Sequence, residues 1–165
     1  MRAVAYSVVV SPEVYRQAAS VLLLREEGNS AGKDVQLLLL HKPRKRDAWQ
    51  LPQGGMEQGE SVAEAAFREL QEEAGVQNAV LLGQSEEVYL YDFPASFRKF
   101  RPDNVKGQQI AFIFARAPQD CVVTVDGVEV DRYMWVSIRN LKNYIHRRAY
   151  ADLLVRLYSE AIACL

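Results

Sequence analysis

The sequence has few cysteines, no long apolar run and no excess of charge of either sign. Its two cysteines, Cys121 and Cys164, form no short pairing motif, which excludes a disulfide framework and makes the cytoplasm the expected location. No apolar stretch approaches the roughly 18 residues of a membrane span, so no membrane partner is expected. Lysine and arginine total 20 and aspartate and glutamate 21, giving a net charge of −1, so this is not a bulk polycation. Any contact with nucleic acid must therefore come from a local basic patch.

The remaining composition is that of an ordinary globular protein. Hydrophobic residues make up 49% and charged residues 25% of the chain, which excludes a disordered chain, a collagen-like chain and a coiled coil. The 165 residues fit one domain spanning residues 1–165. A chain of this size buries roughly 70% of its unfolded surface, so its core requires no disulfide or structural metal.

Apolar runs and turn signals predict a layered α/β domain. Residues 18–24 and 35–40 are apolar runs joined by a polar turn that contains glycine, which predicts a β-hairpin. A helix is predicted over residues 61–74, because Ser61 and Glu64 form a capping box and Gly75 follows the last turn. A second, amphipathic helix is predicted over residues 148–163. Further strands are predicted at residues 80–82, 86–91, 110–116, 121–125 and 133–136. Strands interleaved with two helices favour a layered fold.

Three carboxylates share one stripe of the first predicted helix. At about 100° per residue, Glu69, Glu72 and Glu73 fall within an arc of roughly 100°, beside a separate apolar arc. Like charges at this spacing are unfavourable, and anions in the last helical turn oppose the helix dipole. Mg²⁺ or Mn²⁺ would relieve the repulsion, whereas a solvated acidic face is the alternative for the three glutamates alone. Arg68 is expected to pair with Glu72, and the preceding Gly54–Gly55 loop is expected to let the backbone approach a metal or a phosphate.

The stretch from Gly54 to Val76 resembles the Nudix box at every one of its spaced positions. The matching residues are Gly54, Glu60, Arg68, Glu69, Leu70, Glu72, Glu73, Gly75 and Val76. The resemblance implies an α/β/α sandwich with a central mixed sheet. It also implies Mg²⁺-dependent hydrolysis of a nucleoside diphosphate linked to another group, with Mn²⁺ as a possible substitute.

The same resemblance implies roles for individual residues. Glu69 and Glu73 are the implied metal ligands, with Glu72 as a further ligand or a water-binding carboxylate. The Gly54 carbonyl is an implied ligand, and Glu60 is expected to hold the loop and helix together. A carboxylate from outside the box is also implied.

For that outer carboxylate the sequence offers three candidates. We favour Glu129 as a catalytic residue and metal ligand over Asp126 and Asp131, while a surface turn at Asp126–Gly127 is the structural alternative. Either Glu72 or Glu129 would position or deprotonate the attacking water.

The flanking segments narrow the expected substrate. The segment around Trp49 and Pro52 and the one around Tyr91 resemble the Nudix branch of RNA 5′-pyrophosphohydrolases and dinucleoside polyphosphate hydrolases. A tyrosine at this distance after the box favours dinucleoside polyphosphates such as diadenosine tetraphosphate. Hydrolysis of the 5′-triphosphate end of RNA is the alternative. Sanitation of nucleoside triphosphates and non-catalytic nucleotide binding are further alternatives.

Substrate binding is expected from basic loops, a glutamine and aromatic side chains. The substrate-binding candidates are Lys42, Arg44, Gln53, Tyr91, Lys106 and Arg148. Their chemistry suits phosphate groups or a stacked base, although a solvated surface role is the alternative for any single basic residue. The sequence leaves the oligomeric state open.

Overall fold

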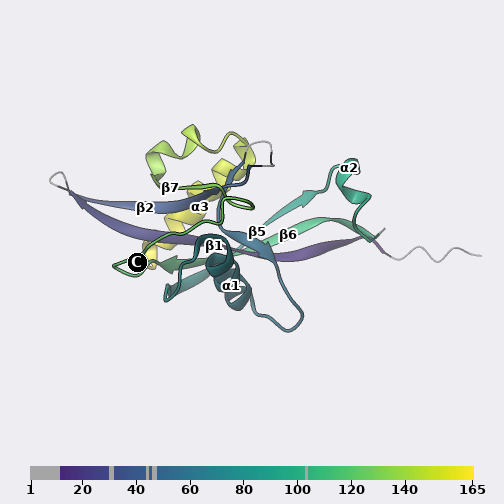
Figure 1. Cartoon of the computed structure of the whole chain (residues 1–165), viewed down its shortest axis with the longest axis horizontal. Coiled ribbons are helices and arrows are strands. Elements are labelled where there is room, and N and C mark those ends of the chain that lie inside the picture. Colours follow the sequence, from purple (N-terminus) through teal and green to yellow (C-terminus); the bar gives the residue numbers. More distant parts are fainter. Residues whose placement is uncertain (1–11, 30–31, 44, 46–47, 103) are drawn as a thin grey trace, which may run out of the picture.

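The computed structural model describes residues 12–29, 32–43, 45, 48–102 and 104–165, which form a mixed seven-stranded sheet between helices (Figure 1). The strands are β1 (Val14–Asn29), β2 (Gly32–His41), β3 (Trp49–Gln50), β4 (Gln53–Gly55), β5 (Val80–Asp92), β6 (Val105–Arg116) and β7 (Arg132–Ser137). The helices are α1 (Val62–Ala74), α2 (Ala95–Arg98), the 3₁₀ helix η1 (Ile138–Asn143) and α3 (Arg148–Ala163). No helix within these described ranges is long and apolar enough to cross a membrane.

Strand β1 organises the sheet, in which the main path runs β3-β2-β1-β6-β5. It runs parallel to β6 along most of its length and antiparallel to both β2 and β4. The predicted hairpin is confirmed, since β1 and β2 pair from Leu24↔Leu37 to Asn29↔Gly32. Beyond the hairpin β4 takes the place of β2 beside β1, with Ala19 opposite Gly54. This exchange brings the glycine pair next to the start of α1.

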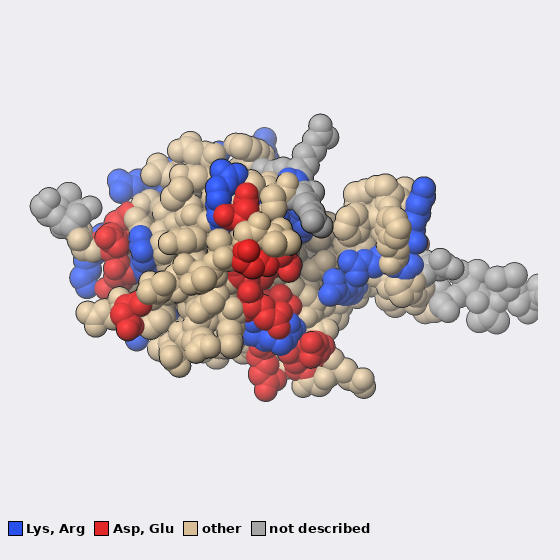
Figure 2. Space-filling model, in the orientation of Figure 1, with Lys and Arg blue, Asp and Glu red and all other residues tan. Residues whose placement is uncertain are grey.

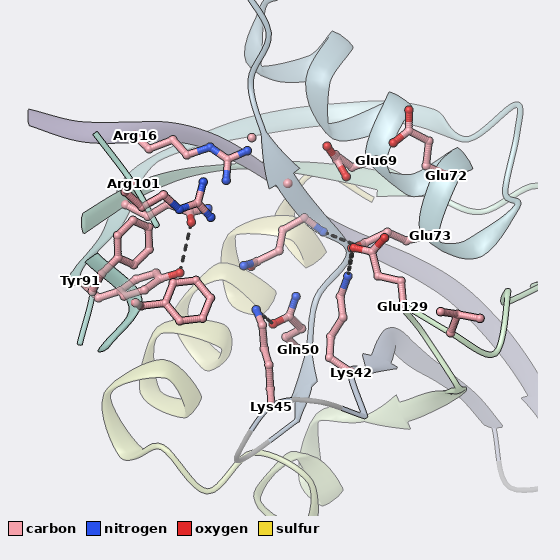
Figure 3. Close-up of a pocket in the computed structure, with 17 residues that line it drawn as sticks. Arg16, Lys42, Lys45, Gln50, Glu69, Glu72, Glu73, Tyr91, Arg101 and Glu129 are labelled. Carbon is pink, nitrogen blue, oxygen red and sulfur yellow. Dashed lines mark hydrogen bonds and ion pairs between the residues drawn. The ribbon is translucent and has the colours of Figure 1, made fainter. Parts of the chain in front are cut away.

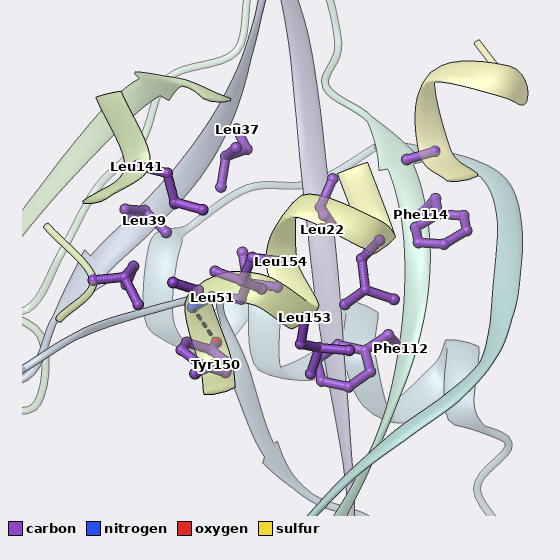
Figure 4. Packing of buried hydrophobic residues seen from close by; sticks show 14 of the residues in the cluster. Leu22, Leu37, Leu39, Leu51, Phe112, Phe114, Leu141, Tyr150, Leu153 and Leu154 are labelled. Atoms are coloured by element: carbon purple, nitrogen blue, oxygen red, sulfur yellow. Dashed lines mark hydrogen bonds between the residues drawn. The ribbon is translucent and has the colours of Figure 1, made fainter. Parts of the chain in front are cut away.

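The two faces of the sheet support two hydrophobic cores. Leu22 and Leu24 of β1 pack in the core beneath α3, which Figure 4 shows, whereas Val21 and Leu23 pack in the core beneath α1. Adjacent strand residues point to opposite faces, so a strand covered on both sides is apolar throughout. Burial of each such leucine contributes roughly 2 kcal/mol. The α/β/α sandwich with a mixed sheet is confirmed.

Both predicted helices are confirmed, including their ends. Ser61 accepts a hydrogen bond from the Glu64 backbone N–H at 3.2 Å, and the Glu64 side chain accepts one from the Ser61 N–H at 2.8 Å. Gly75 closes α1 in the left-handed region at φ 64°. Helix α3 also fixes the approach to the glycine pair, because the buried Tyr150 hydroxyl accepts a hydrogen bond from the Leu51 N–H at 3.1 Å (Figure 4).

Several sequence expectations differ from the structure. Residues 121–125 form no strand, because this segment bonds to the end of α1 through the Thr124 N–H and Ala74 carbonyl rather than to a neighbouring strand. The predicted strands 80–82 and 86–91 are one irregular strand, β5. Residues 94–106, which are polar and basic and lie outside the predicted strands, contain α2 and the first residues of β6. The glycine pair belongs to β4 rather than to a loop, because its backbone pairs with β1.

Candidate active site

A cleft opens where α1, β1 and β4 meet the ends of β5 and β6. It consists of a cavity of about 630 Å³ and a neighbouring one of about 420 Å³. The two share six lining residues: Lys45, Gln50, Gln53, Tyr91, Phe93 and Phe97. Figure 3 shows carboxylates on one side of the larger cavity and arginine and aromatic side chains on the other. We call these sides the acidic wall (Glu69, Glu72, Glu73 and Glu129) and the basic-aromatic wall (Arg16, Arg101, Tyr91, Phe93 and Phe97).

The three glutamates of α1 differ in exposure although they share a stripe. The Glu73 side chain is 3% exposed, that of Glu69 14% and that of Glu72 61%. One turn of helix therefore presents carboxylates from the floor of the cleft to its solvent edge. Figure 2 shows acidic side chains gathered at the centre of the surface, over α1, and basic side chains towards the α2 end of the sheet.

Gly54 allows the acidic wall to touch the backbone of β4. A Cβ atom at this position would lie 2.0 Å from Cδ of Glu69, so any side chain would occupy the space of the carboxylate. The absence of a side chain thus leaves a space bounded by a main chain and a carboxylate. A glycine at the start of the motif thus lets the Glu69 carboxylate keep this position against the backbone.

Lys42 is buried against the acidic wall. Its ammonium group donates to the Glu73 carboxylate and, at 3.0 Å, to Glu129. The Gln53 backbone N–H donates to the second Glu73 oxygen at 3.0 Å. Burial raises the pKa of the Glu73 carboxyl to about 7, and the positive charge of Lys42 only partly opposes this effect. An ionised Glu73 therefore depends on a cation beside it.

The donor chemistry of the acidic wall fits a hard divalent cation. Carboxylate oxygens from Glu69, Glu72, Glu73 and Glu129, together with the Gly54 carbonyl, are the oxygen ligands that Mg²⁺ and Mn²⁺ prefer. Among the described residues, no group of three acidic, histidine or cysteine side chains is already gathered in a metal-binding arrangement. Lysine and arginine instead pair with these carboxylates. A cation would therefore have to displace such a partner and draw the carboxylates together.

Arg68 forms hydrogen bonds that hold part of the acidic wall in place. It donates to Glu60 at 2.7 and 3.0 Å, to Glu69 at 2.7 Å and to the Gly55 carbonyl at 2.8 Å. Its contact with Glu72 is longer, at 3.6 Å. The expected pairing with Glu72 is thus present, but the stronger partners are Glu60 and Glu69. Glu60 holds the loop and the helix together as expected, and it also accepts from the Glu57 N–H at 2.7 Å.

Of the three candidates for the outer carboxylate, only Glu129 lines the cleft. Asp126 instead accepts hydrogen bonds from the backbone N–H groups of residues 128, 129 and 130. Asp131 pairs with Nδ1 of His41 at 2.5 Å. The turn at Asp126–Gly127 is present, with Gly127 at φ 74°. This turn projects Glu129 towards Lys42, so the turn is present and the catalytic role of Glu129 remains a prediction.

The basic-aromatic wall combines Arg16 of β1 with four residues of the continuous stretch 91–101. Arg16 of β1 lies against β4, where a Cβ atom on Gly55 would be 1.9 Å from its guanidinium. The Tyr91 hydroxyl donates to Gln108 at 3.2 Å. The Arg101 guanidinium lies 5.5 Å from the centre of the Phe93 ring. Guanidinium groups and ring faces at one surface are the chemistry that binds phosphates and bases.

The structure brings only some of the predicted substrate-binding residues to the cleft. Lys42, Gln53 and Tyr91 line it. Arg44 lies outside the described residues. Lys106 does not line the cleft and contacts Asp92 at 3.6 Å and Glu13 at 3.7 Å. The Arg148 side chain is 95% exposed and outside the cleft, 3.9 Å from Asp152. Substrate contacts by Lys106 and Arg148 remain predictions that this geometry does not support.

Arg16 is the main residue that the sequence analysis missed. The signal was weak: a lone arginine two positions before Ala18, at the start of an apolar strand. Gln50 and Gln108 also line the cleft without having been singled out as site residues. Their positions depend on strand pairing, which the local sequence does not specify.

Comparisons with known proteins show which family the chain resembles. The NUDIX domain family model matches residues 14–157. An RNA pyrophosphohydrolase from Rhodospirillum rubrum is 30% identical over 155 residues, which cover 90% of each chain. One from Ruthia magnifica is 34% identical over 134 residues, covering 75% of each. The crystal structure of a C. elegans Ap4A hydrolase binary complex superposes with a TM-score of 0.68 at 21% identity, covering 91% of this chain and 99% of that one.

The motif, the sandwich fold and these matches are mutually consistent. The family model covers most of the chain, from the start of β1 through all seven strands and α1 into the middle of α3. The carboxylates of α1 lie in that cleft, where the resemblance of the motif places them. The chain therefore belongs to the Nudix hydrolase family.

Proposed function

We propose that this Nudix hydrolase is a Mg²⁺-dependent RNA pyrophosphohydrolase that cleaves a phosphoanhydride bond at the 5′-triphosphate end of RNA. The observation that carries the proposal is the cleft with two chemically opposite walls. Oxygen ligands for a divalent cation stand on one side, and guanidinium and aromatic groups stand on the other. Several relatives are named RNA pyrophosphohydrolase, and the alignment with one of them covers 90% of each chain. These names support RNA as the substrate.

The chain's own residues account for the remaining chemistry. When bound, Mg²⁺ supplies charge neutralisation and lowers the pKa of a water. Arg16 and Lys45 bind the phosphate chain and hold it along the acidic wall. Glu72 or Glu129 accepts the proton of the attacking water, since both carboxylates stand at the open side of the cleft with large exposed fractions. In-line attack of this water at phosphorus breaks the phosphoanhydride bond and yields pyrophosphate and a 5′-monophosphorylated RNA.

Dinucleoside polyphosphates, the substrates that the sequence analysis placed first, are the second candidate. Tyr91, Phe93 and Phe97 form a run of neighbouring rings beside the cleft, which suits a second base. The relatives by sequence nevertheless favour the RNA alternative. The likeness to an Ap4A hydrolase, at 21% identity, concerns the fold alone.

A turnover panel with excess Mg²⁺ separates these substrates. We expect the highest kcat/KM for 5′-triphosphorylated RNA, lower values for diadenosine tetraphosphate and the lowest for free nucleoside triphosphates. Product analysis in ¹⁸O-labelled water would identify the phosphorus that water attacks. Faster turnover of diadenosine tetraphosphate would overturn the RNA assignment. Absence of turnover on every substrate would favour the non-catalytic alternative.

A cytoplasmic location is part of this proposal. Cys121 and Cys164 are both free thiols, and a reducing compartment would keep them in that state. Retention of activity in millimolar reductant is the expected result, because the cleft contains no disulfide and neither cysteine lines it.

A further inference from the structure

The segment that follows β5 carries an exposed aromatic ring among basic residues. We call residues 95–101, which comprise α2 and the turn after it, the α2 tip. Phe100 is 87% exposed, the largest exposed fraction among the large hydrophobic residues described. Arg98, Lys99 and Arg101 surround it in sequence, and no acidic residue occurs between positions 93 and 102. A single exposed hydrophobic residue is ordinary, but this one stands in a basic setting beside the cleft.

The α2 tip continues the basic-aromatic wall outwards. Phe97 and Arg101 line the larger cavity, and Phe100 lies between them in the chain. Backbone hydrogen bonds fix this short turn: the Phe100 N–H donates to the Phe97 carbonyl at 3.3 Å, and the Arg101 N–H donates to the Arg98 carbonyl at 3.1 Å. These bonds hold Phe100 in a turn between two residues that line the cavity, so its backbone lies next to the edge of the cleft.

Other contacts hold the α2 tip against the body of the domain. Arg98 donates to Glu13 of the region before β1 at 3.1 Å. Arg101 lies over both Phe93 and Phe97, with its guanidinium 5.5 and 5.9 Å from their ring centres. Arg98 and Arg101 make these contacts, whereas the Phe100 ring remains exposed to solvent.

The two cavities have the volume of a small-ligand site rather than of a channel for a polymer. Cavities of this size are typical of sites for drug-sized molecules. The chain that follows an RNA 5′ end must therefore leave the cleft across its rim. Single-stranded nucleic acid binds to surfaces that combine positive charge with exposed aromatic rings, because every base has a face on which a ring can stack.

We propose that the α2 tip binds the single-stranded RNA that follows the 5′ end, with Phe100 stacking on a base and Lys99 close to the backbone phosphates. This inference rests on the proposed function and extends it from the terminal phosphates to the RNA body. It predicts a preference for RNA long enough to reach the rim, without a strong preference for base sequence.

Two triphosphorylated RNAs of different length test the proposal: a dinucleotide and an RNA of about 12 nucleotides. The measured quantity is the ratio of kcat/KM for the long RNA to that for the dinucleotide. Phe100→Ala is expected to lower this ratio about tenfold through the KM of the long RNA, and Phe100→Trp to restore it. The matched control is Val122→Ala, because Val122 is also exposed, at 73%, but lies outside the cleft. This control should leave the ratio unchanged.

A binding measurement provides a second readout that does not depend on turnover. Fluorescence anisotropy with a 5′-hydroxyl RNA of about 12 nucleotides should show weaker binding by Phe100→Ala and normal binding by Phe100→Trp. An unchanged ratio together with unchanged binding would overturn the proposal. An equal loss on the long and short RNAs would also overturn it, because it would indicate damage to the cleft.

The same experiments distinguish this inference from the proposed function. If the wild-type protein hydrolyses neither RNA, the proposed function fails, and the anisotropy measurement still decides whether the tip binds RNA. If Phe100→Ala leaves RNA binding intact but abolishes self-association in sedimentation, the tip is a contact between copies and the proposal is wrong.

Discussion

The two walls of the cleft differ in how the chain builds them. Three of the four glutamates of the acidic wall come from one turn of α1. Four residues of the basic-aromatic wall come from the stretch 91–101, which runs from the end of β5 through the α2 tip, whereas Arg16 comes from β1. Helical spacing alone brings Glu69, Glu72 and Glu73 together. The opposite wall depends on the parallel pairing of β1 with β6 and on the register of β6 with β5.

Because of this difference, we expect one wall to support the reaction itself and the other wall to select the substrate. The acidic wall provides oxygen ligands for a divalent cation, which is a requirement common to phosphoanhydride hydrolysis. We expect the basic-aromatic wall to contact the rest of the substrate, so residues such as Arg16 and Arg101 should set substrate preference. Substitutions in the first wall should therefore affect turnover, and substitutions in the second should mainly affect KM.

The largest expected effect is that of Glu73→Gln on turnover. A neutral amide is a poorer cation ligand than a carboxylate, so kcat should fall by at least about 100-fold, which is the loss caused by removing groups that merely support ligands. The fold should survive, because the amide retains a hydrogen-bond acceptor for the Gln53 N–H. Steady-state kinetics with circular dichroism checks both statements. Glu86→Gln, an exposed glutamate outside the cleft, is the control, and near-normal turnover of Glu73→Gln would remove Glu73 from the metal site.

A substitution in the opposite wall should change a different constant. Arg16→Met removes a guanidinium from the cleft while keeping much of its length, so the KM for triphosphorylated RNA should rise about tenfold, and kcat should change less. Initial rates over a range of RNA concentrations separate the two constants. Arg25→Met, on the distal half of β1, provides a matched control. A fall in kcat with an unchanged KM would place Arg16 among the groups that act on the transition state.

A smaller effect, on the affinity for Mn²⁺, is expected from substitution of Lys42, a basic residue that lies against the acidic wall. Lys42→Met removes the ammonium group that pairs with Glu73 and Glu129, so Mn²⁺ should bind the substrate-free protein severalfold more tightly. Electron paramagnetic resonance titration with Mn²⁺ at pH 8.5 gives this affinity directly. Lys45→Met, whose lysine lies 3.4 Å from Gln50 rather than against a carboxylate, is the control. Weaker Mn²⁺ binding by Lys42→Met would show that Lys42 organises the ligands instead of competing for them.

The smallest effect should concern stability rather than catalysis. Hydrogen bonds from Arg68 and the Glu57 N–H lower the pKa of Glu60 to about 2. Because this pKa lies below the usual value of 4.5, ionised Glu60 stabilises the folded protein above about pH 4.5, and this contribution is lost as the pH falls towards 2. Glu60→Gln should therefore lower Tm by a few degrees at pH 7, and the difference should shrink below pH 4.5. Thermal unfolding across this range, compared with Glu86→Gln, tests the sign, and a difference that grows in acid would contradict it.

The sequence predicted those parts of the molecule whose cause is local. Ser61 and Gly75 mark the ends of α1 because capping depends on residues within one turn. Helix α3 spans the predicted residues because its apolar spacing is continuous. The glutamates of α1 were found for the same reason, since helix geometry converts their spacing into a shared stripe.

The sequence could not predict features that depend on long-range pairing. Arg16 reaches the cleft because β4, rather than β2, lies beside β1 near this residue. No local sequence pattern predicts this change of pairing partner. Residues 121–125 have strand-like composition, yet their backbone finds a partner at the end of α1. Lys42 looked like a phosphate ligand because of its basic loop, whereas the structure buries it against Glu73.

The central claim is that the acidic wall and the Gly54 carbonyl hold a divalent cation against the substrate's phosphates. A crystal structure of the protein with Mn²⁺ and a non-hydrolysable triphosphate tests it most directly, because anomalous scattering locates the metal without assumptions. The account predicts a manganese peak in contact with Glu69, Glu73 and the Gly54 carbonyl, with phosphate oxygens as its remaining ligands. A peak elsewhere, or bound triphosphate with Lys42 still paired to Glu73 and no metal at the acidic wall, would contradict it.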